Sequence, residues 1–103
     1  MIDHSRIAEL RAELGDEDFT EIAALFISEV EDLINGLAGT QPGTELADAL
    51  HRVRGSALNC GLSALAESCL AAETAQRRAP TPFCPIALQT LFRESVSALP
   101  KLG

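Results

Sequence analysis

Apolar side chains recur at spacings of three and four residues in five segments of the chain, which is the pattern of helices that bury one face. The first segment begins at an Asp3 cap and ends at Gly15, a residue suited to a left-handed helix end. Asp16 can cap the second segment, which continues to Leu37. The inward positions are Ile7, Leu10 and Leu14 in the first helix and Phe19, Ile22, Ala23, Phe26, Val30, Leu33 and Leu37 in the second.

A loop separates the second predicted helix from the third. Residues 38–43 combine two glycines and a proline between periodic segments, so we expect the chain to turn back there. Thr44 is placed to cap the third helix, which is predicted to end near Gly61. The inward positions of this helix are Leu46, Leu50, Val53, Ala57 and Cys60.

The fourth helix is predicted to start around Leu62 or Ser63 and to end at the polar turn 76–78, where basic residues suit the helix dipole. Three prolines follow, and Pro85 can open a fifth helix because a proline in the first turn lacks only a donor that would be unpaired. The inward positions are Leu62, Leu65, Ala66, Cys69, Ala72 and Glu73 in the fourth helix and Leu88, Leu91, Phe92, Val96 and Leu99 in the fifth.

The short links between these amphipathic helices predict an all-α fold. We expect an antiparallel four-helix bundle with a short additional N-terminal helix. A chain of 103 residues has room for one domain around one core, so residues 1–103 are expected to form a single domain.

The composition narrows the class of protein. Fifteen acidic and eight basic residues give a net charge of −7, which disfavours nucleic acid and anionic membranes and favours a partner with a basic face. No stretch approaches the roughly 20 apolar residues that span a bilayer, and the start of the chain lacks the basic and apolar regions of a signal peptide. We expect a soluble, cytoplasmic protein that is a monomer.

The cysteines and the carboxylates do not predict a metal site. Cys60, Cys69 and Cys84 are too few and too widely spaced for a disulfide framework or a zinc site, so we expect buried, reduced thiols. A four-helix metal site needs several inward carboxylates and histidines on facing helices, and this sequence offers no such set. No metal and no bound cofactor is therefore expected in this chain.

His51 is the unusual residue of the third predicted helix. On a wheel of 100° per residue it lies about 140° from the centre of the apolar stripe, so its imidazole faces water. Gly55 lies one turn later on the same face, where a mid-helix glycine costs about 1 kcal/mol relative to alanine, and its small size lets another protein approach the ring. Arg54 adds a planar donor fork that can hold phosphate oxygens. Because a neutral imidazole is a nucleophile, the three residues predict a phosphoryl acceptor.

Each of these residues also has a plainer interpretation. An isolated surface histidine is usually only a solvated residue, and Gly55 can serve close helix packing. Arg54 can simply pair with a carboxylate. Periodicity and spacing do not decide between the two sets of interpretations.

From His51 the chain reads His-Arg-Val-Arg-Gly-Ser-Ala-Leu-Asn-Cys-Gly. This stretch and its continuation to Glu73 resemble the signature of the histidine phosphotransfer (HPt) domain family. Arg54 departs from the lysine most common in that family, which keeps the charge but not the geometry, and Ala57 replaces a frequent second serine. The positions that fill the family pattern in register are His51, Arg54, Gly55, Ser56, Asn59, Gly61, Leu65, Cys69 and Glu73.

The resemblance implies that His51 is the phosphorylated residue, that Arg54 helps to hold the phosphoryl group and that Gly55 admits the partner. It implies a carrier that passes phosphoryl groups between receiver-domain aspartates of a two-component phosphorelay, together with a hybrid or sensor histidine kinase. Mg²⁺ would then be held by the acidic pocket of the receiver. Because the chain lacks a glycine-rich ATP-binding signature, we expect no kinase activity of its own.

A receiver is expected to dock on the outer faces of the second and third helices around His51. Leu58, outward on the third helix, is the candidate apolar contact, and a scattered exposed leucine is an equally good interpretation of it. Asp48, one turn before His51, either orients the ring or faces solvent, and we favour solvent. The alternative function is a non-catalytic helical bundle that docks a signalling partner without phosphoryl transfer, and the intact His51 and Gly55 argue against it.

Overall fold

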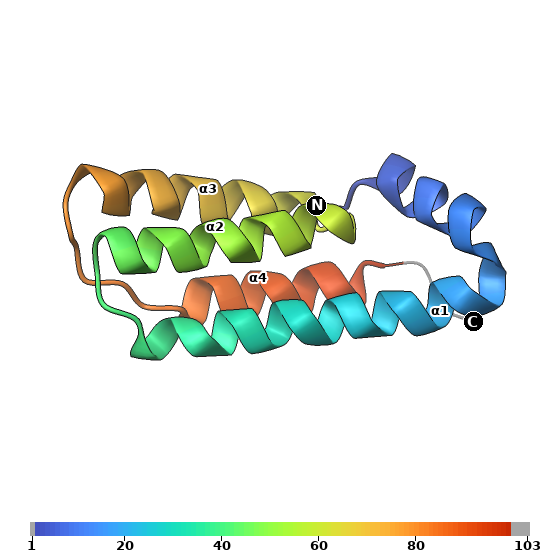
Figure 1. The fold of residues 1–103 in the computed structure, drawn as a ribbon, viewed down its shortest axis with the longest axis horizontal. Coiled ribbons are helices and arrows are strands. Elements are labelled where there is room, and N and C mark those ends of the chain that lie inside the picture. The colour runs from blue at the N-terminus through green and yellow to red at the C-terminus, as the bar shows by residue number, and fades with distance from the viewer. Residues whose placement is uncertain (1, 100–103) are drawn as a thin grey trace.

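The computed structural model describes residues 2–99, so the first and last positions of the predicted domain lie outside the described residues. It contains four α-helices and a short 3₁₀ turn, and within residues 2–99 it has no strand. Consecutive helices run in opposite directions along the bundle (Figure 1). The predicted all-α bundle is confirmed. Its elements are α1 (His4–Gly36), η1 (Leu37–Gly39), α2 (Thr44–Asn59), α3 (Ser63–Arg78) and α4 (Ile86–Ser97).

Helix α1 is broken at Gly15 into the two helices that the sequence predicts. The side chain of Asp3 accepts a hydrogen bond from the Arg6 backbone N–H at 3.1 Å, which confirms the predicted N-terminal cap. Gly15 has φ 79° and ψ 161°, so its backbone is not the left-handed helical one expected at a helix end. Glycine is nonetheless required there, because side chains with a Cβ rarely adopt this region. The chain bends at this point, and the N-terminal helix folds back over the end of the bundle (Figure 1).

The N-terminal helix is attached to the turn between α2 and α3. The Asp3 backbone N–H donates to the Gly61 carbonyl at 2.8 Å, and the Arg6 Nε–H donates to the Asn59 carbonyl at 3.1 Å. Asn59 is the last residue of α2, where helix carbonyls lack partners within the helix, and Gly61 lies in the turn that follows. The Leu62 N–H closes this end by donating to the Ala57 carbonyl, with Gly61 at φ 78°.

Replacing Gly61 by alanine should destabilise the fold by about 2 kcal/mol, because the positive φ is unfavourable for alanine and the turn has no room for a methyl group. A Cβ at this position would lie 2.9 Å from Ile7 Cγ1 and 3.1 Å from the Asp3 carbonyl oxygen. Urea unfolding measures the effect. Gly36→Ala is the matched control, since a Cβ there meets none of the described residues within 4 Å. Equal stability of the two variants would contradict this account of the turn.

The main core lies between α2, α3, α4 and the part of α1 that follows Gly15. The predicted stripes are confirmed, since every predicted inward position is buried or half-buried. Two helix starts differ by one residue from the prediction. Gly43 rather than Thr44 is the N-cap of α2, and Pro85 is the N-cap of α4 rather than its first residue. The buried core residues are Val30, Ile34, Leu37, Leu46, Ala49, Leu50, Val53, Ala57, Cys60, Leu62, Leu65, Ala66, Cys69, Leu88 and Phe92.

Gln76 is a correction to the sequence analysis, because it is buried although it was placed in a polar turn. Its Oε1 accepts from the Gly43 N–H at 2.9 Å and from the Thr81 N–H at 3.3 Å, and its Nε2 donates to the Thr81 carbonyl at 3.0 Å. The side chain thus satisfies backbone groups of the two loops at one end of the bundle.

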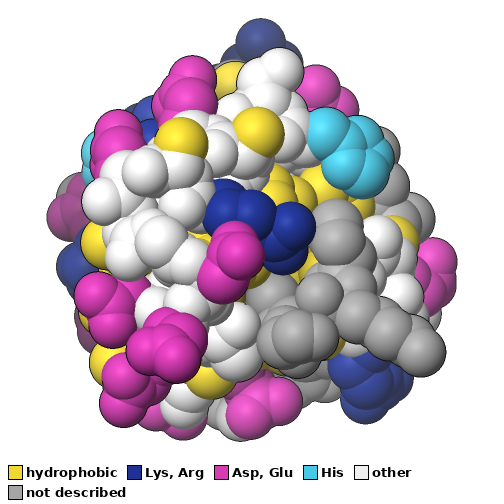
Figure 2. All heavy atoms as spheres, turned by 90° about the vertical axis from the view of Figure 1, so that its right-hand side faces the viewer, with side chains coloured by type: hydrophobic (Ala, Val, Ile, Leu, Met, Phe, Trp, Pro, Cys, Tyr) yellow, Lys and Arg dark blue, Asp and Glu magenta, His cyan; other side chains and the backbone are white. Residues whose placement is uncertain are grey.

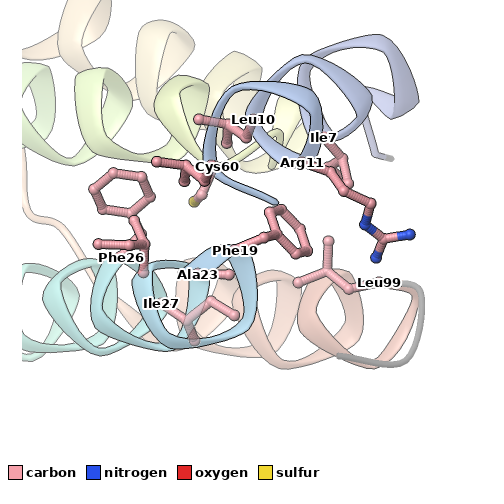
Figure 3. Close-up of a pocket in the computed structure, with 11 residues that line it drawn as sticks. Ile7, Leu10, Arg11, Phe19, Ala23, Phe26, Ile27, Cys60 and Leu99 are labelled. Carbon is pink, nitrogen blue, oxygen red and sulfur yellow. The ribbon is translucent and has the colours of Figure 1, made fainter. Parts of the chain in front are cut away.

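A second, smaller apolar cluster lies between the N-terminal helix and the part of α1 that follows Gly15. Figure 2 looks onto this end of the bundle, where apolar surface is visible between acidic and basic side chains. The packing leaves a cavity of about 20 Å³ beside Cys60 and Leu99 (Figure 3), which is room for about one water molecule. The cavity is lined mainly by apolar side chains. The buried members of the cluster are Ile7, Leu10, Phe19 and Ala23.

The cysteines follow the prediction in two cases of three. Cys60 and Cys69 are buried, and burial raises the pKa of their thiols to about 11 and about 12. Cys84 is exposed in the loop between α3 and α4, so the expectation of a buried thiol is wrong there. Proline-rich loop residues carry no apolar period that would indicate which of them face inward. Of the helices within residues 2–99, none combines the length and the apolar character needed to cross a membrane.

Candidate functional site

His51 lies on the outer face of α2, as the helical wheel predicts. Its side chain is 57% exposed, whereas Leu50 and Val53 on either side of it in the sequence are fully buried. The helix is anchored by these apolar neighbours against α3, which lies beside it (Figure 1). The imidazole is therefore held on a packed element and is open to solvent.

The two ring nitrogens of His51 have different surroundings. Nδ1 lies 3.3 Å from Glu73 Oε1 and 3.2 Å from Arg54 Nη2. None of the residues 2–99 forms a hydrogen bond with Nε2. Nδ1 can donate to the carboxylate only when it carries the proton, and it can accept from the guanidinium only when it does not. An ionised Glu73 favours the proton on Nδ1, which leaves the lone pair on Nε2.

Glu73 reaches the ring from α3 and is itself buried, at 7% exposure. Its Oε2 accepts a hydrogen bond from Arg77 Nε at 3.0 Å, and Arg77 Nη2 lies 2.9 Å from the same oxygen. Burial raises the pKa of Glu73, but the hydrogen bonds from Arg77 and His51 and the charges of these residues outweigh it. The net effect is a pKa below the ordinary value, so Glu73 is a carboxylate at neutral pH.

Arg54 lies beside the ring on the same side as Glu73. Its side chain is 28% exposed, and its Nε is 3.9 Å from Glu73 Oε1. Both sequence interpretations remain compatible with this placement. The guanidinium is near the Glu73 carboxylate, and its Nη2 also lies 3.2 Å from Nδ1 of His51.

Gly55 leaves the surface open one turn after His51. A Cβ built on Gly55 meets none of the described residues within 4 Å, so close helix packing does not explain this glycine. It borders a shallow groove between α1 and α2, and Leu58 in this groove is 52% exposed. The other groove residues are Glu29, Leu33, Arg52, Ser56 and Asn59.

The Hpt domain family matches residues 21–101 of this sequence. The chain belongs to the Hpt domain family. Hpt domains are phosphocarrier modules of two-component signalling that interact with receiver domains and kinases, and they are not kinases themselves. No curated protein and no solved structure matched the chain.

The Hpt match covers the four-helix part of the fold and leaves the N-terminal helix before Gly15 outside it. Of the positions that carry the family resemblance, Cys69 is fully buried and Ser56 donates a hydrogen bond to Glu29 Oε1 of α1 at 3.3 Å. These two positions therefore contribute to packing and to the contact between helices.

Sequence reasoning missed how Glu73, Arg77 and Asp48 combine around this Hpt histidine. Glu73 is placed correctly on the inward face, but periodicity does not reveal that it contacts His51. Asp48 does not contact the ring, and it is not merely solvated, since its Oδ1 accepts from Arg77 Nη2 at 3.1 Å. The available signal was a carboxylate in an otherwise apolar stripe, because a buried charge requires partners.

Proposed function

We propose that this chain is a histidine phosphotransfer protein in which His51 shuttles a phosphoryl group between receiver-domain aspartates. The observation that supports this best is the setting of the ring, with Nδ1 next to the Glu73 carboxylate and the side chain 57% exposed. Gly55, one turn away and with free space around it, is where the receiver surface would approach. The family match adds independent support.

In the proposed step, the lone pair of Nε2 attacks the phosphorus of an aspartyl phosphate on the receiver. A nitrogen–phosphorus bond forms, the bond between phosphorus and the aspartate oxygen breaks, and the aspartate leaves as a carboxylate. The ring keeps its Nδ1 proton and gains positive charge, which the adjacent Glu73 carboxylate stabilises. Arg54, whose guanidinium lies at the Nδ1 side of the ring, would contact the incoming phosphoryl oxygens. Transfer to the next receiver is the reverse reaction.

The proposed partners are receiver domains and a hybrid or sensor histidine kinase. Docking would use the groove beside Gly55, with Leu58 as its apolar contact, because transient interfaces combine a modest apolar patch with a polar rim. Mg²⁺, when required, would belong to the acidic pocket of the receiver. This chain would supply the nucleophile and the surface that positions it, and the phosphoryl group would come from the partner.

The test is incubation of the chain with a ³²P-phosphorylated receiver or with a hybrid kinase, ATP and Mg²⁺ from the same source. We expect label on the chain that is lost in acid and kept in alkali, which is the behaviour of phosphohistidine and not of phosphoserine. Incubation with ATP and Mg²⁺ alone should give no label. Absence of label with every cognate receiver and kinase, together with measurable binding to one of them, would favour the docking-only bundle instead.

A further inference from the structure

We propose that Arg77 is a positioning residue for the phosphotransfer reaction, because with Asp48 it fixes the Glu73 carboxylate in the orientation that keeps His51 Nε2 unprotonated. This inference rests on the proposed function and concerns the same site. Arg77 does not itself contact the ring. Its influence passes through Glu73, which lies one helical turn before it on α3.

The two carboxylate oxygens of Glu73 have different partners. Oε2 accepts a hydrogen bond from Arg77 Nε at 3.0 Å, and Arg77 Nη2 lies 2.9 Å from the same oxygen. Oε1 is left for the ring, at 3.3 Å from Nδ1 of His51. Both Arg77 contacts fall on the same oxygen, so they hold Oε2 at the guanidinium and leave Oε1 as the oxygen that faces the ring. Arg77 therefore determines which way the second oxygen points.

Asp48 holds Arg77 from the opposite helix. Its Oδ1 accepts from Arg77 Nη2 at 3.1 Å, and it lies on α2 one turn before His51. The contacts thus form a closed circuit from His51 to Glu73 and Arg77 on α3 and back through Asp48 to α2. A circuit that ties the nucleophile to both helices preserves the orientation of the carboxylate while α2 is contacted by a partner.

The position of Arg54 shows what Arg77 contributes to the orientation of Glu73. It is the other cation facing Glu73, with Nε 3.9 Å from Oε1, the oxygen that contacts the ring. Without Arg77, the unneutralised carboxylate would draw Arg54 towards itself and away from the phosphoryl group. The ring would then lose its acceptor at Nδ1. An imidazole side chain without such a partner prefers the proton on Nε2, where it blocks the nucleophilic lone pair.

The experiment compares Arg77→Met with Arg78→Met in ¹⁵N-labelled chains. Arg78 is the matched control because it is the next residue of the same helix, is exposed and has no hydrogen bond or ion pair with residues 2–99. Long-range ¹H–¹⁵N spectra in alkaline buffer report the tautomer of His51, and His4→Gln assigns the signals because the chain has two histidines. We expect the Nδ1-protonated form in the wild type and Arg78→Met, and a mixture with the Nε2-protonated form in Arg77→Met.

The same variants are compared for the rate of transfer from a phosphorylated receiver. We expect a fall of about tenfold in the maximal rate for Arg77→Met, with little change in the receiver concentration giving half-maximal rate, and no fall for Arg78→Met. Arg77→Lys keeps the charge but not the two-point contact and should recover only part of the rate. Asp48→Asn, which leaves Arg77 in place, should have a smaller effect in the same direction.

Two results would overturn the proposal: an unchanged His51 tautomer in Arg77→Met, or equal transfer rates in the two methionine variants. Circular dichroism checks that each variant is folded, and if Arg77→Met is not, Arg77→Lys and Asp48→Asn carry the comparison. If the wild type accepts no phosphoryl group, the proposed function fails. The tautomer measurement needs no partner, so in that case it still decides whether Arg77 orients Glu73.

Discussion

Replacing His51 by glutamine should reduce phosphoryl labelling of the chain below detection while leaving its stability within about 0.5 kcal/mol of the wild type. The imidazole is 57% exposed, and substitutions at exposed positions usually change stability by no more than this. Arg77 still contacts the Glu73 carboxylate in this variant, so the buried charge keeps a partner. An amide nitrogen is not a nucleophile, so no phosphoryl acceptor would remain at this site.

The matched control is His4→Gln, since His4 is the other histidine of the chain and is also exposed. It lies in the first turn of the N-terminal helix, outside the region that matches the Hpt family. We expect His4→Gln to accept label at the wild-type rate. Label that persists on His51→Gln, or that disappears from His4→Gln, would show that the assignment of the acceptor is wrong. Urea unfolding of both variants separates a loss of chemistry from a loss of fold.

The helices and the exposure of His51 could be predicted because both depend on contacts within one segment. An apolar stripe fixes which face of α2 is buried, and the position of His51 on the opposite face follows from the same period. Gly15 and Gly61 could be recognised as helix ends because both have positive φ. Glycine adopts positive φ more readily than other residues, so such positions are visible in the sequence. The exposed position of His51 on α2 is therefore confirmed, and its role as phosphoryl acceptor stays a prediction.

The contacts around the ring could not be predicted because they depend on how two helices are aligned. The period of α3 places Glu73 inward, but its distance from His51 is set by the relative positions of α2 and α3 along the bundle. The same limit explains Gln76, whose partners Gly43 and Thr81 lie in loops with no periodicity. A buried charged or amide side chain therefore indicates that partners exist without indicating which residues they are.

Replacing Gly55 by glutamine should raise the free energy of unfolding and lower the rate of phosphoryl transfer from a receiver. Glycine is disfavoured in the interior of a helix by about 1 kcal/mol relative to alanine and by somewhat less relative to glutamine. A Cβ at this position meets none of the described residues within 4 Å, so we expect the free energy of unfolding to rise by about 0.5 kcal/mol. The same side chain would project from the face of His51, one turn away, and would hold a docking receiver at a distance. We expect kcat/KM for transfer to fall by about 100-fold.

Gly36→Gln is the control for Gly55→Gln, because Gly36 is the last residue of α1 and a Cβ there also meets no described residue within 4 Å. It should leave transfer unchanged. Since steric exclusion acts on approach of the partner, a small phosphodonor such as acetyl phosphate or phosphoramidate, where it labels the wild type, should label Gly55→Gln at a similar rate. Wild-type transfer from a receiver to Gly55→Gln would mean that the partner does not approach over this glycine. An equal loss with the small donor would instead indicate that the variant disturbs His51 itself.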